Sequence, residues 1–350
     1  IGLDGAWLWV DGRYFLQAGA QLDGTTVELM KMGEPGVPTL DAFLDSKLVK
    51  GDKLGFDGRV VSMDEGSLYE GIALKHGGCI EYSLDLIDEI WTDRPPLSEK
   101  PAFELDVKYA GKTVADKLSD IREKMAAAEA DMHVVTTIDD ICWTLNIRGD
   151  DIDFFPLILS YALMDDKAYH LYIDERKLSD EIKAHLTADG VVLHPYNDIY
   201  EDIKHIPADA KLMLDASKVN YAMFCNIPDS VKKIDVMNPE MIFKNVKNPV
   251  ELENIRKAQI KDSIAHLRFM KWLKENVGKI EMTEISVSDK LDEFRKEMGN
   301  FIRPSFEPIS SYGAHAAIVH YAPTPESDIP VLPKGMHLTD TGAGFYEGST

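Results

Sequence analysis

Two kinds of apolar pattern alternate along the chain. Continuous short apolar runs predict buried strands at residues 6–10, 133–137, 169–173 and 211–215. Between residues 113 and 130, apolar side chains instead recur every three or four positions, which predicts an amphipathic helix. Further short strands are expected at 53–57 and 72–74. This succession of strands and helices is typical of an α/β fold.

A long helix is predicted to begin after Asn248. Asn248 can cap the helix, Pro249 suits its first position, and Glu251 can complete a capping box. The apolar stripe that follows reaches Leu273. A further helix is expected at residues 284–298, where glycine ends it.

After these helices the pattern favours strands. Residues 316–320 and 336–340 are short apolar runs that each end on a polar side chain. Residues 341–350 contain three glycines and are expected to form the turn of a hairpin, without a second strand to pair.

Prolines mark a linker near residues 91–101. The expected division is therefore an N-terminal α/β domain at 1–92, a second at 103–237, and the beginning of a third domain at 238–350. Because the first residue is Ile1 rather than Met, the sequence is expected to be one portion of a longer chain.

Composition excludes some classes of protein. The net charge of −22 argues against a broad surface for nucleic acid or anionic membrane, since both need clustered Lys and Arg. The longest strongly apolar stretch, residues 154–164, is too short to cross a membrane. The three widely spaced cysteines form no zinc or disulfide framework, and each is expected to be a small buried hydrophobe in a reducing compartment.

Two residues, Asp340 and His320, are candidates for a functional role. Asp340 ends an apolar strand before a sharp turn, so it is either a turn aspartate or one ligand of a metal ion. His320 ends the preceding predicted strand, where an imidazole is either structural or suited to proton transfer and oxyanion stabilisation. His315 and His337 are weaker candidates for a catalytic role.

A third candidate is Arg148, in a predicted turn with two acidic residues after it. It lies either in a solvated loop or at a cleft or subunit contact. The phosphate-binding, dinucleotide-binding, zinc-protease and serine-hydrolase motifs are absent. The residues alone therefore indicate a multidomain α/β protein with candidate hydrolytic chemistry.

Seven segments, read in order, carry a family resemblance. They are residues 9–18 (WVDGRYFLQA), 90–95 (IWTDRP), 143–151 (WTLNIRGDD), 283–286 (TEIS), 305–311 (SFEPISS), 318–323 (IVHYAP) and 340–350 (DTGAGFYEGST). Together they resemble aminopeptidase P, the Xaa-Pro aminopeptidases of the creatinase–prolidase–methionine aminopeptidase group. The last segment is similar to the family motif D-S-G-x-x-Y-x-x-G-T-T-D, with Thr341 in place of serine.

The resemblance implies two creatinase-N-like α/β domains followed by an incomplete pita-bread metallopeptidase domain. It implies a cytoplasmic, homodimeric enzyme that removes an N-terminal residue before proline and uses two divalent metal ions, usually Mn²⁺. Asp340 would be a metal ligand, with the remaining ligands beyond residue 350. His320 would act in catalysis and substrate binding, and Arg148 would bind substrate.

Two alternatives remain open. Prolidase-type dipeptidases share the catalytic fold but generally have a single N-terminal domain. Pita-bread domains without metal ligands serve as peptide-binding or protein-binding modules, although a binding module has no need for both Asp340 and His320.

Overall fold

A computed structural model describes all residues, 1–350. Internal contacts divide the chain into two compact units, residues 1–47 with 253–350, and residues 48–252. The division into domains at 1–92, 103–237 and 238–350 stays a prediction. None of the helices is both long and apolar enough to cross a bilayer.

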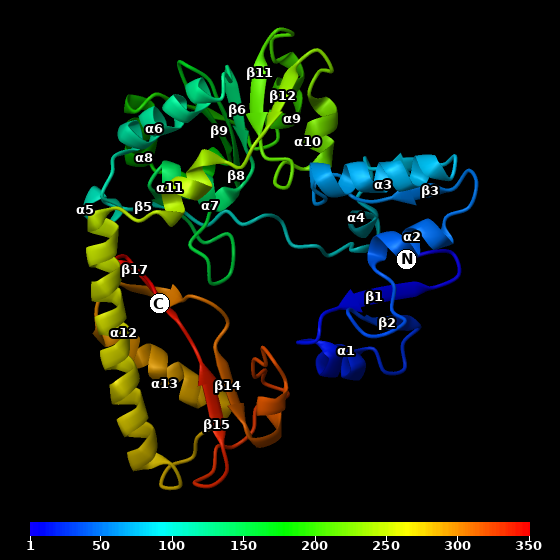
Figure 1. Ribbon diagram of the computed structural model, residues 1–350. Coiled ribbons are helices and arrows are strands. Elements are labelled where there is room, and N and C mark those ends of the chain that lie inside the picture. Colours follow the sequence, from blue (N-terminus) through cyan, green and yellow to red (C-terminus); the bar gives the residue numbers. More distant parts are fainter. The chain divides into compact units, whose positions relative to one another are not determined.

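The unit of residues 48–252 is built on a six-stranded mixed sheet in the order β10-β9-β8-β6-β11-β12 (Figure 1). β6, β11 and β12 run parallel to one another, β8 is antiparallel to β6 and β9, and β9 is parallel to β10. The bounds of the strands are Met132–Val135 (β6), Ser160–Met164 (β8), Tyr169–Ile173 (β9), Val191–His194 (β10), Lys211–Leu214 (β11) and Lys232–Asp235 (β12).

Helices cover both faces of this sheet, so that alternate residues of its central strands are buried in two different cores. Val135 and Met213 join the core made with α6, α7 and α8, whereas Val134 and Leu214 join the core made with α9 and α10. Burial on both faces explains the continuous apolar runs of these strands. The helices are Val114–Ala127 (α6), Ile138–Thr144 (α7), Asp180–Ala188 (α8), Ile199–Asp202 (α9), Tyr221–Asn226 (α10) and Pro239–Asn245 (α11), with short 3₁₀ turns at Glu175–Lys177 (η1) and Ile203–His205 (η2).

The rest of this unit consists of smaller elements. They are Lys53–Gly55 (β3), Met63–Lys75 (α3), Cys79–Glu81 (β4), Leu86–Ile90 (α4), Phe103–Glu104 (β5), Val107–Ala110 (α5) and Ile147–Arg148 (β7). The strand predicted at 72–74 is wrong, since these residues belong to α3, whose capping box at Ser62 starts a helix nine residues earlier than the apolar run. Cys142 is buried as predicted, whereas Cys79 and Cys225 are exposed; all three are free.

The other unit includes a parallel strand pair near the N-terminus. Ala6–Val10 (β1) pairs with Val27–Lys31 (β2), with Phe15–Gln21 (α1) between them and Leu40–Lys47 (α2) after them. The strand predicted at 6–10 is confirmed.

The C-terminal part of the same unit, which begins at residue 253, contains two helices: most of Pro249–Asn276 (α12) and all of Glu284–Glu297 (α13). The capping box is confirmed, because Asn248 Oδ1 accepts from the N–H of Glu251 and the Glu251 carboxylate accepts from the N–H of Asn248. Phe269 of α12 packs against Val287 and Leu291 of α13. The strands that follow are Phe301–Pro304 (β13), Ile309–Tyr312 (β14), His337–Asp340 (β15), Ala343–Phe345 (β16) and Gly348–Ser349 (β17), and the 3₁₀ helix is Gly313–Ala317 (η3).

Candidate functional site

His320 does not end a strand, so that prediction is wrong. The 3₁₀ helix η3 takes the first two residues of the expected run, Ala316 and Ala317. The chain then continues through turns in which Ile318 donates to the His315 carbonyl and Tyr321 donates to the Ile318 carbonyl. His320 itself has a φ of 59°, in the left-handed region that a non-glycine residue seldom adopts. Local hydrogen bonds of this kind replace the cross-strand ladder that the apolar run predicts.

The imidazole of His320 is exposed and has one ring nitrogen engaged. The hydroxyl of Tyr14, from the WVDGRYFLQA segment, lies 2.9 Å from Nδ1 of His320, and the two rings meet edge to face. This contact fixes the orientation of the ring and leaves Nε2 available to a ligand. The sequence alone could not show it, because 306 positions separate the two residues.

Asp340 is the last residue of β15, as predicted, and its neighbour across the antiparallel pair with β14 is Ile309. Its carboxylate is exposed. The 3₁₀ helix η3, which precedes His320, packs against both β14 and β15. His320 therefore follows a segment that contacts the strand ending in Asp340.

The hairpin after Asp340 does have strand partners, which corrects the expectation of an unpaired strand. β16 pairs with β13 on one side and with β17 on the other. Gly342 lies where the chain turns into this sheet, and a Cβ there would fall 2.1 Å from Ser305 Oγ and 2.3 Å from the carbonyl oxygen of Thr350. Only glycine fits so close an approach of backbone to backbone.

A buried arginine ties this hairpin to the two helices. Arg295 of α13 is fully buried, and its Nε donates to Asp262 of α12 at 2.8 Å. Its Nη2 donates to Thr341 Oγ1 at 2.9 Å, directly beside Asp340. The Thr350 hydroxyl donates to the other oxygen of Asp262 at 2.8 Å. Both ends of the hairpin are thus held by one ion-paired cluster.

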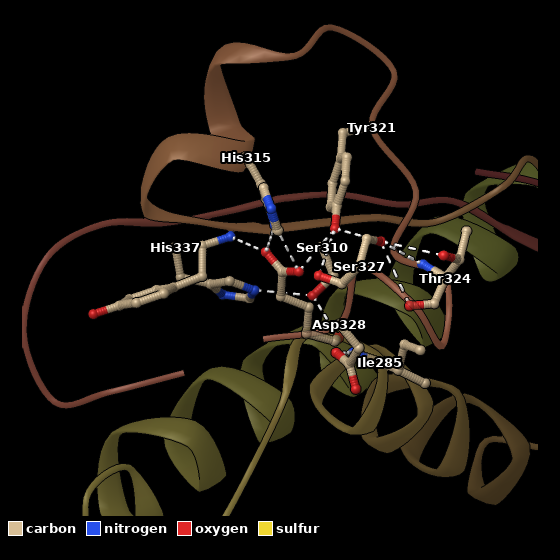
Figure 2. A network of polar contacts seen from close by, with 10 residues as sticks. Ile285, Ser310, His315, Tyr321, Thr324, Ser327, Asp328 and His337 are labelled. Atoms are coloured by element: carbon tan, nitrogen blue, oxygen red, sulfur yellow. Dashed lines mark hydrogen bonds and ion pairs between the residues drawn. The ribbon is translucent and has the colours of Figure 1, made fainter. Parts of the chain in front are cut away.

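A second buried group, Glu284, was not among the predicted site residues. It is the first residue of α13 and is completely buried. Both oxygens of its carboxylate have hydrogen-bond partners (Figure 2). His315 Nδ1 lies 3.0 Å from Oε2, and the Tyr321 hydroxyl donates to the same oxygen at 3.0 Å. The TEIS segment was the only signal in the sequence that could have pointed to it.

His337 belongs to the same neighbourhood but contacts a serine. Its Nε2 lies 2.9 Å from Ser310 Oγ, which donates to the main-chain carbonyl of Glu284 at 2.7 Å. Burial lowers the pKa of His337. Of the two weaker histidine candidates, His315 therefore contacts a carboxylate and His337 contacts a hydroxyl.

Arg148 lies in the other unit, in the two-stranded pairing of β7 with β5. Its Nη1 donates to the main-chain carbonyls of Cys142 at 2.7 Å and Ile147 at 2.9 Å. Burial lowers the pKa of Arg148 and that of the neighbouring Lys117, which falls to about 7. The Lys117 ammonium donates to the Trp143 carbonyl at 2.6 Å and lies over the Trp143 ring. These contacts hold β7, so Arg148 lies in a short strand and not in the predicted turn.

The residues present do not by themselves fit a metal centre. No group of three or more His, Cys, Asp or Glu side chains is placed to hold an ion. Asp340 offers one exposed carboxylate, whereas hard divalent cations need several oxygen or nitrogen ligands around one point.

Comparison with known proteins finds two family matches, which lie in residues 93–350. Residues 93–251 match the creatinase/prolidase N-terminal domain, and residues 253–350 match metallopeptidase family M24. A probable Xaa-Pro aminopeptidase P from Sordaria macrospora is 35% identical over 100% of this chain and 59% of its own length. An Xaa-Pro aminopeptidase from Caenorhabditis elegans is 36% identical over 99% of this chain and 57% of its own length.

Solved structures agree with the sequence comparison. An X-prolyl aminopeptidase from Caenorhabditis elegans, described as a cytosolic enzyme with a di-nuclear active site, matches 100% of this chain with a TM-score of 0.95 at 33% identity. This chain covers 58% of that structure, so it spans about three fifths of the length of these relatives. An Xaa-Pro dipeptidase from Bacillus anthracis matches 68% of this chain with a TM-score of 0.52 at 16% identity, which shows a common fold alone.

Proposed function

Because this chain belongs to metallopeptidase family M24, with a creatinase/prolidase N-terminal domain before the peptidase part, we propose that it is part of a metal-dependent Xaa-Pro aminopeptidase. The observation that carries the proposal is the superposition on an X-prolyl aminopeptidase along the whole chain, with a TM-score of 0.95. The curated relatives at 35% and 36% identity are Xaa-Pro aminopeptidases, so a prolidase-type activity is the weaker candidate.

His320 is the proposed catalytic and substrate-binding residue. With Nδ1 held by Tyr14, its Nε2 can donate to the carbonyl oxygen of the bond before proline. A donor aimed at that oxygen stabilises the developing oxyanion more than the ground state, which lowers the barrier to hydrolysis. Arg148 is a proposed second substrate-binding residue, acting through the part of its guanidinium that the two carbonyls leave free.

Asp340 is the proposed metal ligand. The similar Caenorhabditis elegans enzyme has a di-nuclear active site, and we propose that the whole protein likewise binds two divalent ions, with Mn²⁺ as their identity. Since the residues described do not fit a complete centre, the other ligands are proposed to lie beyond residue 350.

The remaining parts of the proposal concern substrate and assembly. The substrates are peptides with a penultimate proline, whose ring bends the backbone and removes a hydrogen-bond donor. The protein is proposed to be a cytoplasmic homodimer without a nucleic-acid or membrane partner. The net charge of −22 supports the last point, since an acidic surface repels both.

The test is release of the N-terminal residue from an Xaa-Pro-Pro peptide by the full-length protein loaded with Mn²⁺. We expect cleavage of this peptide, no cleavage of Xaa-Ala-Pro, and a loss of about 100-fold or more in kcat for His320→Asn. His205→Asn is the matched control, because His205 is an exposed histidine with a side chain 73% accessible.

Other outcomes select the alternatives. Cleavage of Xaa-Pro dipeptides alone would assign a prolidase-type dipeptidase. Tight binding of proline peptides without cleavage, by protein that contains no metal, would assign a binding module and overturn the proposal.

A further inference from the structure

Glu284 is a buried carboxylate that receives hydrogen bonds from three residues of one segment, 312–321. The main-chain N–H of Tyr312, the ring of His315 and the hydroxyl of Tyr321 all donate to it. These donors come from positions 28, 31 and 37 residues away in sequence. Figure 2 shows the side chains of His315 and Tyr321 pointing toward this carboxylate, whereas Tyr312 contributes only its main-chain N–H.

The three donors enclose the segment that carries His320. Tyr312 ends β14, His315 lies in η3, and Tyr321 directly follows His320. His320 has a φ of 59°, a strained conformation that persists only where surrounding contacts over-determine it. His315 before this strained residue and Tyr321 after it both form hydrogen bonds with Glu284.

The same point is linked to the strand that ends in Asp340. Ser310 donates to the Glu284 carbonyl, so the proton between Ser310 and His337 belongs to His337 Nε2. His337 Nδ1 then accepts from Thr339 Oγ1 at 3.3 Å. The start of α13 is therefore hydrogen-bonded directly to the His320 segment, and to β15 through Ser310.

We propose that Glu284 is a positioning residue that holds His320 in its reactive place relative to Asp340. The proposal rests on the proposed function, since it concerns the same hydrolytic site. A carboxylate suits this task because it only accepts hydrogen bonds and can serve three donors at once. An apolar residue of similar size would leave these donors without acceptors.

The experiment compares Glu284→Gln with Glu281→Gln in the full-length, metal-loaded protein. Glutamine keeps the volume of the side chain but presents a donor on one side of its amide, where donors already converge. Glu281 lies three positions earlier and is exposed, which makes it a matched control. We expect Glu284→Gln to lower kcat for an Xaa-Pro-Pro peptide by about 10-fold to 100-fold with KM changed less than about 3-fold. The control should stay at the wild-type value.

A double-mutant cycle separates positioning from a general structural effect. If Glu284 acts through His320, Glu284→Gln should cost less than about 3-fold in a His320→Asn background. An equal loss in both backgrounds would overturn the proposal. So would a Glu284→Gln variant as active as the control.

Two further measurements test the role of Glu284 independently of the Glu284→Gln kinetics. If Glu284→Gln fails to fold, Tyr321→Phe removes one donor and keeps the ring, and its loss of kcat should likewise disappear in the His320→Asn background. In metal-free protein, the ring signals of labelled His320 should shift or broaden in Glu284→Gln and not in the control. If the wild-type protein cleaves no proline peptide, the proposed function fails, whereas failure of the cycle in an active enzyme refutes only the role of Glu284.

Discussion

Replacing Arg295 by methionine should loosen the sheet that follows Asp340. Arg295 is fully buried, with ion pairs to Asp262 at 2.8 Å and Asp292 at 3.2 Å and a hydrogen bond to Thr341. Methionine preserves the apolar part of the side chain and removes the guanidinium. Two carboxylates would then lie close together without a cation.

The magnitude follows from the burial of these partners. Removing one member of a buried ion pair costs about 3–5 kcal/mol. The side chains of Asp262 and Asp292 retain 14% and 21% exposure, so water can reach them and we expect the lower end, about 3 kcal/mol. Burial also raises the pKa of Asp292, which eases its protonation when the cation is lost. A loss of that size corresponds to roughly 100-fold in the local opening equilibrium.

Hydrogen exchange of the main-chain amides is the suitable assay, because it reports local opening in a protein of several domains. We expect amides of β13 and β16 to exchange roughly 100-fold faster in Arg295→Met. The matched control is Arg268→Met, since Arg268 pairs with Glu297 at 3.2 Å while both side chains are more than half exposed. It should change exchange by about 5-fold at most. Equal exchange in the two variants would refute the assigned role of Arg295.

Three further predictions concern the site and the core. Tyr14→Phe should lower kcat about 10-fold with little change in stability, because it frees the ring of His320. Steady-state kinetics measures this, and an unchanged kcat would show that the contact does not contribute to catalysis. Asp340→Asn should lower the bound-metal stoichiometry of the full-length protein, measured by elemental analysis, and an unchanged metal content would exclude it as a ligand. His133 is fully buried, and although burial lowers its pKa, Glu240 raises it by charge and by a hydrogen bond at 3.2 Å, with a net rise. The resulting stabilisation is complete below the unfolded pKa of about 6.5 and is lost as pH rises through the folded pKa. The difference in free energy of unfolding between wild type and His133→Gln, measured in urea, should therefore shrink from pH 6 to pH 9. A constant gap would show that the pair does not titrate.

The sequence by itself determined the elements whose signals are local. The run at 169–173 became β9 with the same bounds, and the periodic stretch after Thr113 became α6. The capping box at Asn248 formed as expected. Such features depend on residues within one or two turns of each other, so their pattern is visible in the chain. The family resemblance was likewise readable from short segments in order.

Only the tertiary structure decided how the site is held together. The apolar run before His320 favours a strand, but no partner strand forms and turns close over Glu284 instead. An acidic residue in the first turn of a helix is ordinarily an exposed partner of the helix dipole, whereas Glu284 is completely buried. Arg295 follows an ordinary helical pattern in α13, yet its partners come from α12 and from the hairpin after Asp340. Hydrogen bonds between residues far apart in sequence depend on how the elements pack, and packing leaves no periodic trace in the chain.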